Sequence, residues 1–293
     1  MDITGKTKLT GLIGSPVAHS ISPQMHNEAF RQLGLDYIYL AFDISDDDLK
    51  TAVEGLKTIG ICGFNITMPH KTRMLEYVDE LTDAARIAGA CNTVIAKNGR
   101  FIGHTTDGIG FMQSVKDAGH DIIGQKMTLL GAGGAATAIC TQAALDGVSE
   151  IDIFRRYRPD AFSETERFAA SVRSNTNCNV NVYDIADTGC LKDSLESSRI
   201  LVNATNVGMA PRVDACPIPD SSLLHPELIV SDIIYNPRKT RLYQMAEQIG
   251  CPTFNGMYML LFQGAASFEC WTGRKMPVEI IRQKYFQPQE ETV

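Results

Sequence analysis

Three polar side chains of different chemistry follow an apolar run in the first third of the chain. The stretch from Asn65 to Lys71 is NITMPHK, which places an amide, a hydroxyl and an amine after apolar residues 61–64. A carboxylate, Asp107, stands in HTTDGIG. Burial disfavours a charged amine and a nearby carboxylate favours it, so Lys71 and Asp107 could exchange a proton with an alcohol or ketone oxygen. Each also has an ordinary explanation, because a single loop lysine is usually solvated and Asp107 could cap a helix beginning at Gly108.

Two hydroxyls lie in the segment HSISP, directly before an expected helix. The pattern predicts a helix over residues 22–33, with Ser22 as its N-cap and Pro23 at its first position. Ser20 and Ser22 could instead bind an anion such as a carboxylate, which a helix N-terminus stabilises. Both interpretations stay open. Four histidines have no metal-ligand spacing and are interpreted as structural or surface residues: His19, His26, His70 and His104.

The segment KMTLLGAGGAATAIC combines an apolar strand, a glycine-rich turn and the start of a helix. Its GAGGAA fits the dinucleotide-binding fingerprint, in which Gly131 permits the turn, Gly133 lets the backbone approach a pyrophosphate and Ala136 allows close helix–strand packing. Small residues also fill turns that bind nothing, but the flanking strand and helix favour a nucleotide site. The cofactor-binding residues predicted from this turn are Gly131, Ala132, Gly133, Gly134 and Ala135.

The next expected strand ends in IFRRYRPD, which holds Arg155, Arg156 and Arg158. An NAD site usually has an acidic residue there for the ribose hydroxyl, whereas guanidinium groups suit the 2′-phosphate of NADP. The cluster therefore favours NADP. NAD remains an alternative because a small loop shift could bring Asp160 to the ribose, and the cluster could also be a solvated basic turn.

Strand-like and helix-like segments alternate along the chain, which predicts an α/β fold with parallel pairing. In the first third, strands are expected at residues 9–14, 37–44 and 60–67, followed by a helix from about Pro69. The pair Asn98-Gly99 between two apolar runs predicts a β-hairpin. A second α/β unit begins near Lys126, and two apolar C-terminal helices must pack against other elements.

Composition argues against several other classes of protein. The chain has 293 residues, is 44% hydrophobic and 21% charged, and carries a formal net charge of −7 without a basic block. That balance is ordinary for a soluble protein of two domains and indicates no nucleic-acid partner. No apolar run approaches the roughly 20 residues of a membrane span, and the N-terminus lacks the apolar core of a signal peptide. The eight cysteines are scattered, so we expect reduced thiols, no bound metal and a cytoplasmic location.

Taken together, these segments resemble the shikimate dehydrogenase family over nearly the whole chain. GSPVAHSISPQMHN is similar to the family's N-terminal substrate motif, and NITMPHK to its Asn-x-Thr-x-Pro-x-Lys catalytic motif. The motifs GACNTV, TDG, GAGGAA, NATNVGM, DIIYNPRKT and NGMYMLLFQGA follow in the family's order.

The resemblance implies an enzyme of aromatic amino-acid (chorismate) biosynthesis that interconverts shikimate and 3-dehydroshikimate with a nicotinamide cofactor, as a monomer or homodimer. It implies a discontinuous substrate domain (residues 1–107 and 257–293), a Rossmann domain (108–256) and a cleft between them. Lys71 would be the catalytic acid–base beside Asp107, and Ser20 and Ser22 would bind the substrate carboxylate. The remaining implied contacts are Asn65, Thr67, Asn92, Asp107 and Gln263 at the ring hydroxyls, Tyr235 at the substrate, and Thr205 and Gly256 near the cofactor.

One departure from the family pattern bears on specificity. Most NADP-specific members carry Asn-Arg-Thr after the second nucleotide-domain strand, where this chain has Arg155-Arg156-Tyr157. The quinate/shikimate branch has an Asp nearby and also accepts NAD and quinate, and DYIYLAFDI and LLFQGAASFECWTG resemble that branch. Quinate use therefore stays open. So do two alternatives, a dehydrogenase for a related hydroxylated or amino-substituted carbocycle and a non-catalytic sensor of nucleotide and a shikimate-like ligand.

Overall fold

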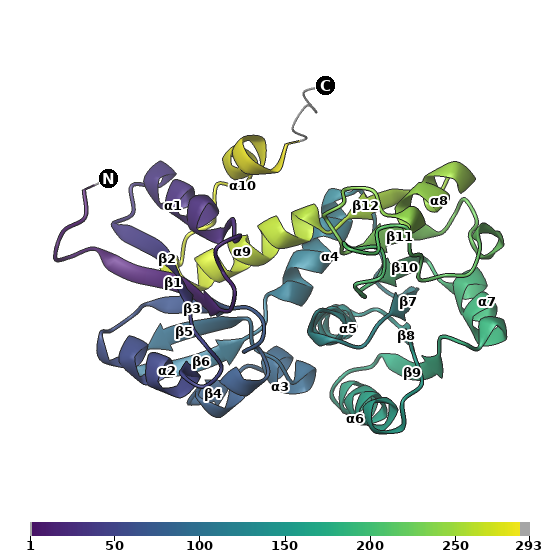
Figure 1. Cartoon of the computed structure of the whole chain (residues 1–293), viewed down its shortest axis with the longest axis horizontal. Coiled ribbons are helices and arrows are strands. Elements are labelled where there is room, and N and C mark those ends of the chain that lie inside the picture. Colours follow the sequence, from purple (N-terminus) through teal and green to yellow (C-terminus); the bar gives the residue numbers. More distant parts are fainter. Residues whose placement is uncertain (1, 288–293) are drawn as a thin grey trace. The chain divides into compact units, whose positions relative to one another are not determined.

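The computed structural model describes residues 2–287, which form two compact α/β units (Figure 1). The first unit extends to Thr106 and resumes at Leu261, and the second runs from Asp107 to Leu260. The prediction of two α/β units is confirmed, since each unit is built on a six-stranded sheet flanked by helices.

The first unit is assembled from short strands and helices that alternate along the chain. Its strands are β1 (Lys8–Gly14), β2 (Tyr37–Asp43), β3 (Gly63–Ile66), β4 (Glu80–Leu81), β5 (Thr93–Lys97) and β6 (Arg100–His104). Its helices are α1 (Ser22–Gln32), α2 (Leu49–Thr58), the 3₁₀ turn η1 (Arg73–Glu76), α3 (Asp83–Ala88), most of α9 (Met257–Thr272), α10 (Val278–Ile281) and the π turn η3 (Arg282–Phe286).

The sheet of the first unit has the order β2-β1-β3-β5-β6-β4, and strand alternation gives its two faces different characters. Phe64 and Ile66 of β3 join the apolar core beneath α2. Asn65, between them, hydrogen-bonds on the opposite face to Ser267 of α9. Helix α9 therefore covers the face that carries the polar side chains of β3.

Three local predictions for this unit are corrected. β3 and β5 pair antiparallel although helical segments separate them, because the connection holds one 3₁₀ turn and a six-residue helix in place of a full crossover helix. No helix begins at Pro69. Ser22 is the first residue of α1 and not its N-cap; that position is Ile21, without a side-chain cap, and the Oγ of Ser20 accepts the backbone N–H of Ser22 at 3.2 Å.

The predicted hairpin at Asn98-Gly99 is confirmed. β5 and β6 pair antiparallel across it, and both turn residues have positive φ, 52° and 75°. Such a conformation matches the twist of the flanking strands.

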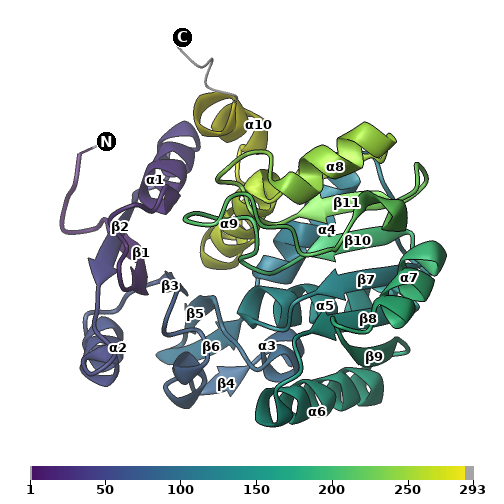
Figure 2. The same cartoon turned by 45° about the vertical axis from the view of Figure 1, so that its right-hand side comes forward.

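The second unit is a parallel sheet with helices on both faces (Figure 2). Its strands are β7 (Lys126–Leu130), β8 (Glu150–Arg155), β9 (Asn179–Asp184), β10 (Ile200–Asn203), β11 (Ile229–Asp232) and β12 (Thr253–Asn255). Its helices are α4 (Asp107–Asp117), α5 (Gly134–Asp146), α6 (Pro159–Asn175), α7 (Thr188–Ser197), the 3₁₀ turn η2 (Ser221–Leu223) and α8 (Arg241–Ile249). The order β9-β8-β7-β10-β11-β12 is that of a Rossmann fold, in which the direction of chain progression reverses between β7 and β10.

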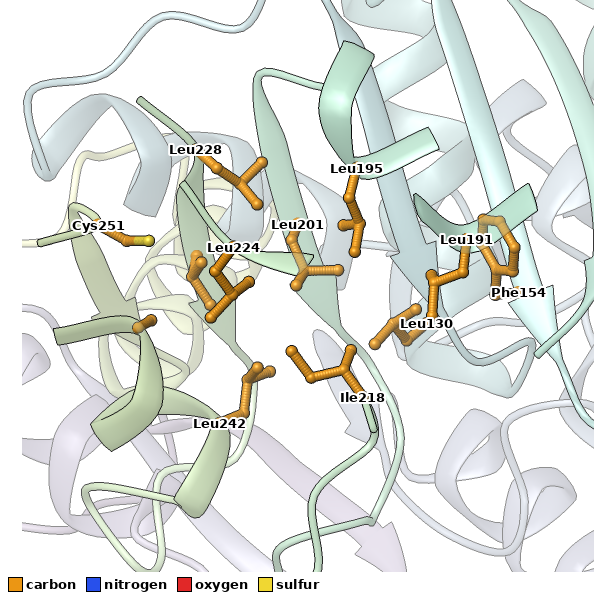
Figure 3. Packing of buried hydrophobic residues seen from close by; sticks show 12 residues of the cluster. Leu130, Phe154, Leu191, Leu195, Leu201, Ile218, Leu224, Leu228, Leu242 and Cys251 are labelled. Atoms are coloured by element: carbon orange, nitrogen blue, oxygen red, sulfur yellow. The ribbon is translucent and has the colours of Figure 1, made fainter. Parts of the chain in front are cut away.

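Apolar side chains from α7, α8 and the strand faces beneath them form one core of the second unit (Figure 3). Leu191 and Leu195 of α7 and Leu242 of α8 are fully buried against Leu201 of β10. This packing fixes the strands whose C-terminal ends carry the loops predicted to bind a cofactor.

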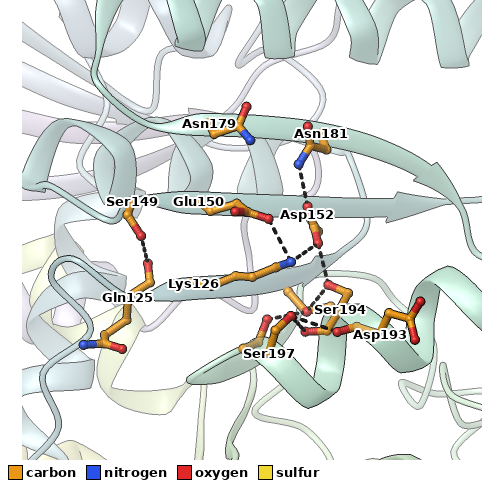
Figure 4. A network of polar contacts seen from close by, with 12 residues as sticks. Gln125, Lys126, Ser149, Glu150, Asp152, Asn179, Asn181, Asp193, Ser194 and Ser197 are labelled. Carbon is orange, nitrogen blue, oxygen red and sulfur yellow. Dashed lines mark hydrogen bonds and ion pairs between the residues drawn. The ribbon is translucent and has the colours of Figure 1, made fainter.

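A buried carboxylate of the second unit is paired with several polar groups (Figure 4). The carboxylate of Asp152, which is 2% exposed, accepts hydrogen bonds from Asn181 at 2.9 Å and from Ser194 at 2.7 Å. It also forms an ion pair with Lys126 at 2.8 Å. The charge is therefore compensated on several sides, as a buried carboxylate requires.

Candidate active site

Six polar residues of the first unit form a buried network that we call the amide–hydroxyl cluster. They come from β3, from β5 and the residue before it, from the segment after β6, and from α9: Asn65, Asn92, Thr93, Thr106, Gln263 and Ser267. All six are at least nine-tenths buried. The fold thereby brings together three of the predicted substrate-binding residues, namely Asn65, Asn92 and Gln263.

The two asparagine amides are held by several partners each. Asn65 Nδ2 donates to Ser267 Oγ at 2.9 Å and to the backbone oxygen of Asn92 at 3.1 Å. Asn92 Oδ1 accepts the backbone N–H of Thr106 at 2.7 Å, and its Nδ2 lies 3.4 Å from Gln263 Oε1. Their orientations are thus set by the protein before any ligand arrives.

A buried tyrosine extends the cluster toward α1. The Tyr39 hydroxyl donates to Asn65 Oδ1 at 2.8 Å. Burial raises the pKa of Tyr39 well above its usual value, and a hydrogen bond with Ser22 partly opposes that rise. The neutral phenol therefore connects Asn65 with Ser22, another predicted substrate-binding residue, and the backbone N–H of Ser22 donates to Ser20 Oγ.

The segment that carries Thr67 and Lys71 is fixed by backbone contacts. The backbone N–H of Thr67 donates to Ile13 at 2.9 Å, and the carbonyl of Lys71 accepts from the N–H of Cys91 at 2.9 Å. Between them, the fully buried His70 places Nε2 at 2.8 Å from the carbonyl of Ile44. His70 is therefore structural, as predicted, and it anchors the loop from which the Lys71 side chain extends.

The other predicted catalytic and substrate residues belong to the second unit. Asp107 is 8% exposed and is itself the first residue of α4, so it does not precede a helix starting at Gly108. Tyr235 follows β11 and is 45% exposed.

The glycine-rich turn after β7 has the local geometry that the sequence predicts. Gly131 has a φ of 106°, a conformation that favours glycine. A Cβ on Gly131 would lie 2.8 Å from the carbonyl oxygen of Ala204, so this turn and the loop after β10 are in close contact. A Cβ on Gly133 or Gly134 would meet no protein atom within 4 Å. The backbone at the start of α5 is therefore accessible, as a bound pyrophosphate requires.

The three arginines after β8 have different environments. Arg155 is half-buried, and its Nη1 donates to Ala161 O and Thr165 Oγ1 at 2.5 Å each. Arg156 and Arg158 are exposed, and so is Asp160 in the first turn of α6. Arg155 is thus engaged in holding α6, whereas the other two present their guanidinium groups to solvent.

The loop carrying Thr205 is tied to the end of β11 by a buried carboxylate. Asn203 Oδ1 accepts from the Thr205 hydroxyl at 2.7 Å, and Asn203 Nδ2 donates to Asp232 at 3.1 Å. Asp232 also accepts from Thr240 at 2.7 Å, while burial raises its pKa. Gly256 packs tightly nearby, since a Cβ there would overlap the carbonyl oxygen of Ile233.

Sequence inspection missed four residues that shape these contacts: Tyr39, Thr93, Thr106 and Ser267. Signals existed for three of them. Ser267 stands four residues after Gln263 and so lies on the same helical face, and Thr93 and Thr106 lie in the motifs GACNTV and TDG. Among residues 2–287, no group of three or more His, Cys, Asp or Glu side chains could hold a metal, and no helix in that range is long and apolar enough to cross a membrane.

Two protein-family descriptions match segments of the chain. Residues 12–94 match the family described as "Shikimate dehydrogenase substrate binding domain". Residues 256–284 match "Shikimate 5'-dehydrogenase C-terminal domain". Both segments contain parts of the amide–hydroxyl cluster.

Similar proteins match over nearly the full length. A shikimate dehydrogenase (NADP(+)) of Listeria monocytogenes is 51% identical over 284 residues, which is 97% of each chain. A crystal structure of shikimate 5-dehydrogenase from Listeria monocytogenes in complex with shikimate and NAD is 50% identical, with a TM-score of 0.93 over 97% of this chain and 98% of that one. Quinate dehydrogenase from Corynebacterium glutamicum in complex with NAD is 27% identical, with a TM-score of 0.84 over 96% and 99% of the two chains.

Proposed function

The chain belongs to the shikimate dehydrogenase family, and we propose that it catalyses the reversible oxidation of shikimate to 3-dehydroshikimate. The cofactor is NADP, with NAD as an alternative, and the reaction serves chorismate biosynthesis. We assign substrate binding to residues 1–107 and 257–293 and cofactor binding to residues 108–256.

The observation that carries this proposal is the convergence of three amides in the first unit. Asn65, Asn92 and Gln263 come from distant parts of the sequence and share one buried network. Amides both donate and accept hydrogen bonds, so a set of them suits a ring with several hydroxyls. Ser20 and Ser22 at the start of α1 suit a carboxylate, which shikimate also carries, and Thr67 and Tyr235 complete the proposed substrate contacts.

The proposed chemistry of the protein is a proton transfer at the reacting oxygen. Oxidation removes a proton from a ring hydroxyl, and the neutral amine of Lys71 accepts it; in the reverse direction the ammonium returns it. Asp107 orients that amine and accepts a hydrogen bond from the substrate hydroxyl. The backbone contacts on either side of His70 hold the Lys71 segment in place, which reduces the reorganisation needed in the transition state.

The glycine turn of the second unit fits a dinucleotide. Open space at Gly133 and Gly134 admits a pyrophosphate to the N–H groups of α5, and Gly131 brings the turn against the loop of Thr205. This is the crevice at the reversal point of the sheet, where such ligands bind in Rossmann folds. The bound nicotinamide accepts or supplies the hydride. Ala132, Ala135 and Gly256 complete this proposed site.

Exposed guanidinium groups support the preference for NADP. Arg156 and Arg158 can pair with a 2′-phosphate through charge-assisted hydrogen bonds, whereas Arg155 already donates within its own unit. We therefore assign the discrimination between NADP and NAD to Arg156 and Arg158, and a supporting role to Arg155.

The test is a spectrophotometric assay at the reduced-nicotinamide band with shikimate, quinate or neither, and with NADP+ or NAD+. Wild type should reduce NADP+ with shikimate. Lys71→Met keeps the length of the side chain and removes the amine, so kcat should fall by about 10²–10⁴-fold with little change in the KM for shikimate. Absence of turnover with both ring acids would reject the proposal. A raised KM with unchanged kcat would make Lys71 a binding residue only.

Quinate is a second candidate substrate, and the quinate dehydrogenase of similar fold supports it. Shikimate and quinate both present a carboxylate and ring hydroxyls, so the proposed contacts serve either molecule. The ratio of kcat/KM for the two acids in the same assay decides between a shikimate-specific enzyme and a dual one.

A further inference from the structure

Two hydroxyls at the centre of the amide–hydroxyl cluster carry a role that the proposed chemistry does not use. Thr93 and Ser267 are both 0% exposed. Their oxygens lie 2.8 Å apart, and each is within 3.1 Å of Asn65 Nδ2 and of Thr106 Oγ1. They therefore connect β3, β5, the segment after β6 and α9 at one point.

The groups around the two hydroxyls decide which of them accept from Asn65. A serine or threonine hydroxyl has one proton and two lone pairs, and an amide nitrogen can only donate. Ser267 Oγ donates to the Gln263 carbonyl at 3.1 Å and accepts from Asn65 Nδ2. Thr93 Oγ1 donates to Asn92 Oδ1 at 3.1 Å and also accepts from Asn65 Nδ2. The Asn65 nitrogen is thereby directed into the cluster, and its Oδ1 is left on the side of Tyr39.

We propose that Ser267 and Thr93 are positioning residues of the substrate site. Their hydroxyls hold the Asn65 amide so that its oxygen, and not its nitrogen, is presented to a ligand hydroxyl beside Tyr39. Asn65 then acts on the ligand as a hydrogen-bond acceptor. This inference rests on the proposed function for its kinetic consequence, but its structural content is independent of any ligand.

Removing either hydroxyl should loosen the amide without removing a group that touches the substrate. Ser267→Ala and Thr93→Val change little in shape and leave Asn65 with fewer acceptors. The KM for shikimate should rise about 3–10-fold, the equivalent of one neutral hydrogen bond. The KM for NADP+ should stay unchanged. Thr93→Ser keeps the hydroxyl, so its KM for shikimate should stay close to that of wild type. If Ser267→Ala does not fold, the comparison of Thr93→Val with Thr93→Ser provides the test.

A buried hydroxyl of the second unit supplies the matched control. Ser194 is 3% exposed and bonds to Asp152 and Thr128 at 2.7 Å each. Ser194→Ala should lower the thermal midpoint as Ser267→Ala does, but leave the KM for shikimate unchanged. If Ser267→Ala and Thr93→Val also lower stability alone, with the KM for shikimate unaltered, the positioning role is overturned and the proposed function stands.

A measurement without ligand tests the orientation of Asn65 independently of the proposed function. In protein with ¹⁵N-labelled asparagine, the side-chain amide protons of Asn65 should exchange slowly with solvent, and faster in Ser267→Ala. If wild type shows no shikimate turnover, the proposed function fails while slow exchange still supports the orientation of Asn65. Fast exchange in wild type would overturn the inference whatever the kinetics show.

Discussion

The pH dependence of stability should reveal the buried His26 imidazole. His26 is fully buried and stacks on Tyr39 with ring centroids 4.4 Å apart. Neither of its ring nitrogens has a hydrogen-bond partner among the described residues. Burial lowers its pKa from 6.5 to about 3. The folded chain therefore keeps the ring neutral in a range where the unfolded chain binds a proton.

The sign and size of the effect follow from this difference. Because the folded pKa is depressed, the contribution to stability is complete above pH 6.5 and is lost as the pH falls toward 3. At pH 5 the unfolded imidazole is about 1.5 pH units below its pKa, and at about 1.36 kcal/mol per unit the loss is about 2 kcal/mol. This loss of about 2 kcal/mol develops between pH 7 and pH 5, and it grows further as the pH falls toward 3.

The measurement is urea unfolding at pH 7, 6 and 5, compared between wild type and His26→Phe. Trp271, the chain's single tryptophan, is 5.3 Å from His26 between ring centroids and belongs to the same unit, so its fluorescence reports the relevant transition. His104, whose pKa burial also lowers, titrates in both proteins and cancels in the comparison. The exposed His19 gives a control, since His19→Gln should keep the wild-type slope.

The expected result is that wild type loses about 2 kcal/mol more than His26→Phe between pH 7 and pH 5. Any change in packing caused by the phenyl ring shifts both ends of the curve equally and leaves this difference intact. Parallel curves for the two proteins would refute the argument, because they would mean that His26 is protonated as readily in the folded chain as in the unfolded one.

Three further predictions concern the second unit. Gly133→Ala should leave the thermal midpoint within a few degrees of wild type, since no protein atom lies near the added methyl. It should nevertheless raise the KM for NADP+, and an unchanged KM would argue against a pyrophosphate at this turn. Arg156→Ala should weaken the binding of NADP+ by about 1–3 kcal/mol and leave the binding of NAD+ unaffected, whereas Arg155→Ala should mainly reduce stability. Equal losses of binding for both cofactors in Arg156→Ala would contradict these different roles. Lys126→Met removes the cation beside Asp152 and should cost about 3 kcal/mol in chemical denaturation; a loss below about 1 kcal/mol would show that the neighbouring hydrogen bonds suffice.

Two turns and the α/β character of the fold could be predicted from the sequence. The turn at Gly131 and the hairpin at Asn98 follow from backbone conformations that few residues tolerate. The alternation of elements was enough to predict two α/β units. One error concerned Ser22, which is the first residue of α1 and not its N-cap, and whose hydroxyl hydrogen-bonds to Tyr39.

The amide–hydroxyl cluster was predicted only in part: the family resemblance implied Asn65, Asn92 and Gln263 as substrate contacts, but not that their amides share one buried network. Asn65 and Ser267 are 202 positions apart, and nothing in the residues near either one indicates the other. Threonine and serine in strands and helices usually serve local or solvent contacts, so Thr93 and Ser267 were not assigned a role from their own chemistry. Their importance becomes visible only when α9 is known to cover that face of the sheet.

The return of the chain to the first unit imposes an order on synthesis. Residues 107–260 are complete in sequence before most of α9 has been translated, whereas the first unit needs Phe268, Trp271 and Ser267 to cover its polar face. Domains generally fold as units while the chain emerges, so the second unit can close first. The larger, N-terminal part of the first unit must wait, with the aromatic rings of Phe30 and Tyr39 not yet packed against α9. A ribosome that stalls after Leu260 would therefore release a chain with a folded Rossmann unit and an incomplete partner, a substrate for chaperones.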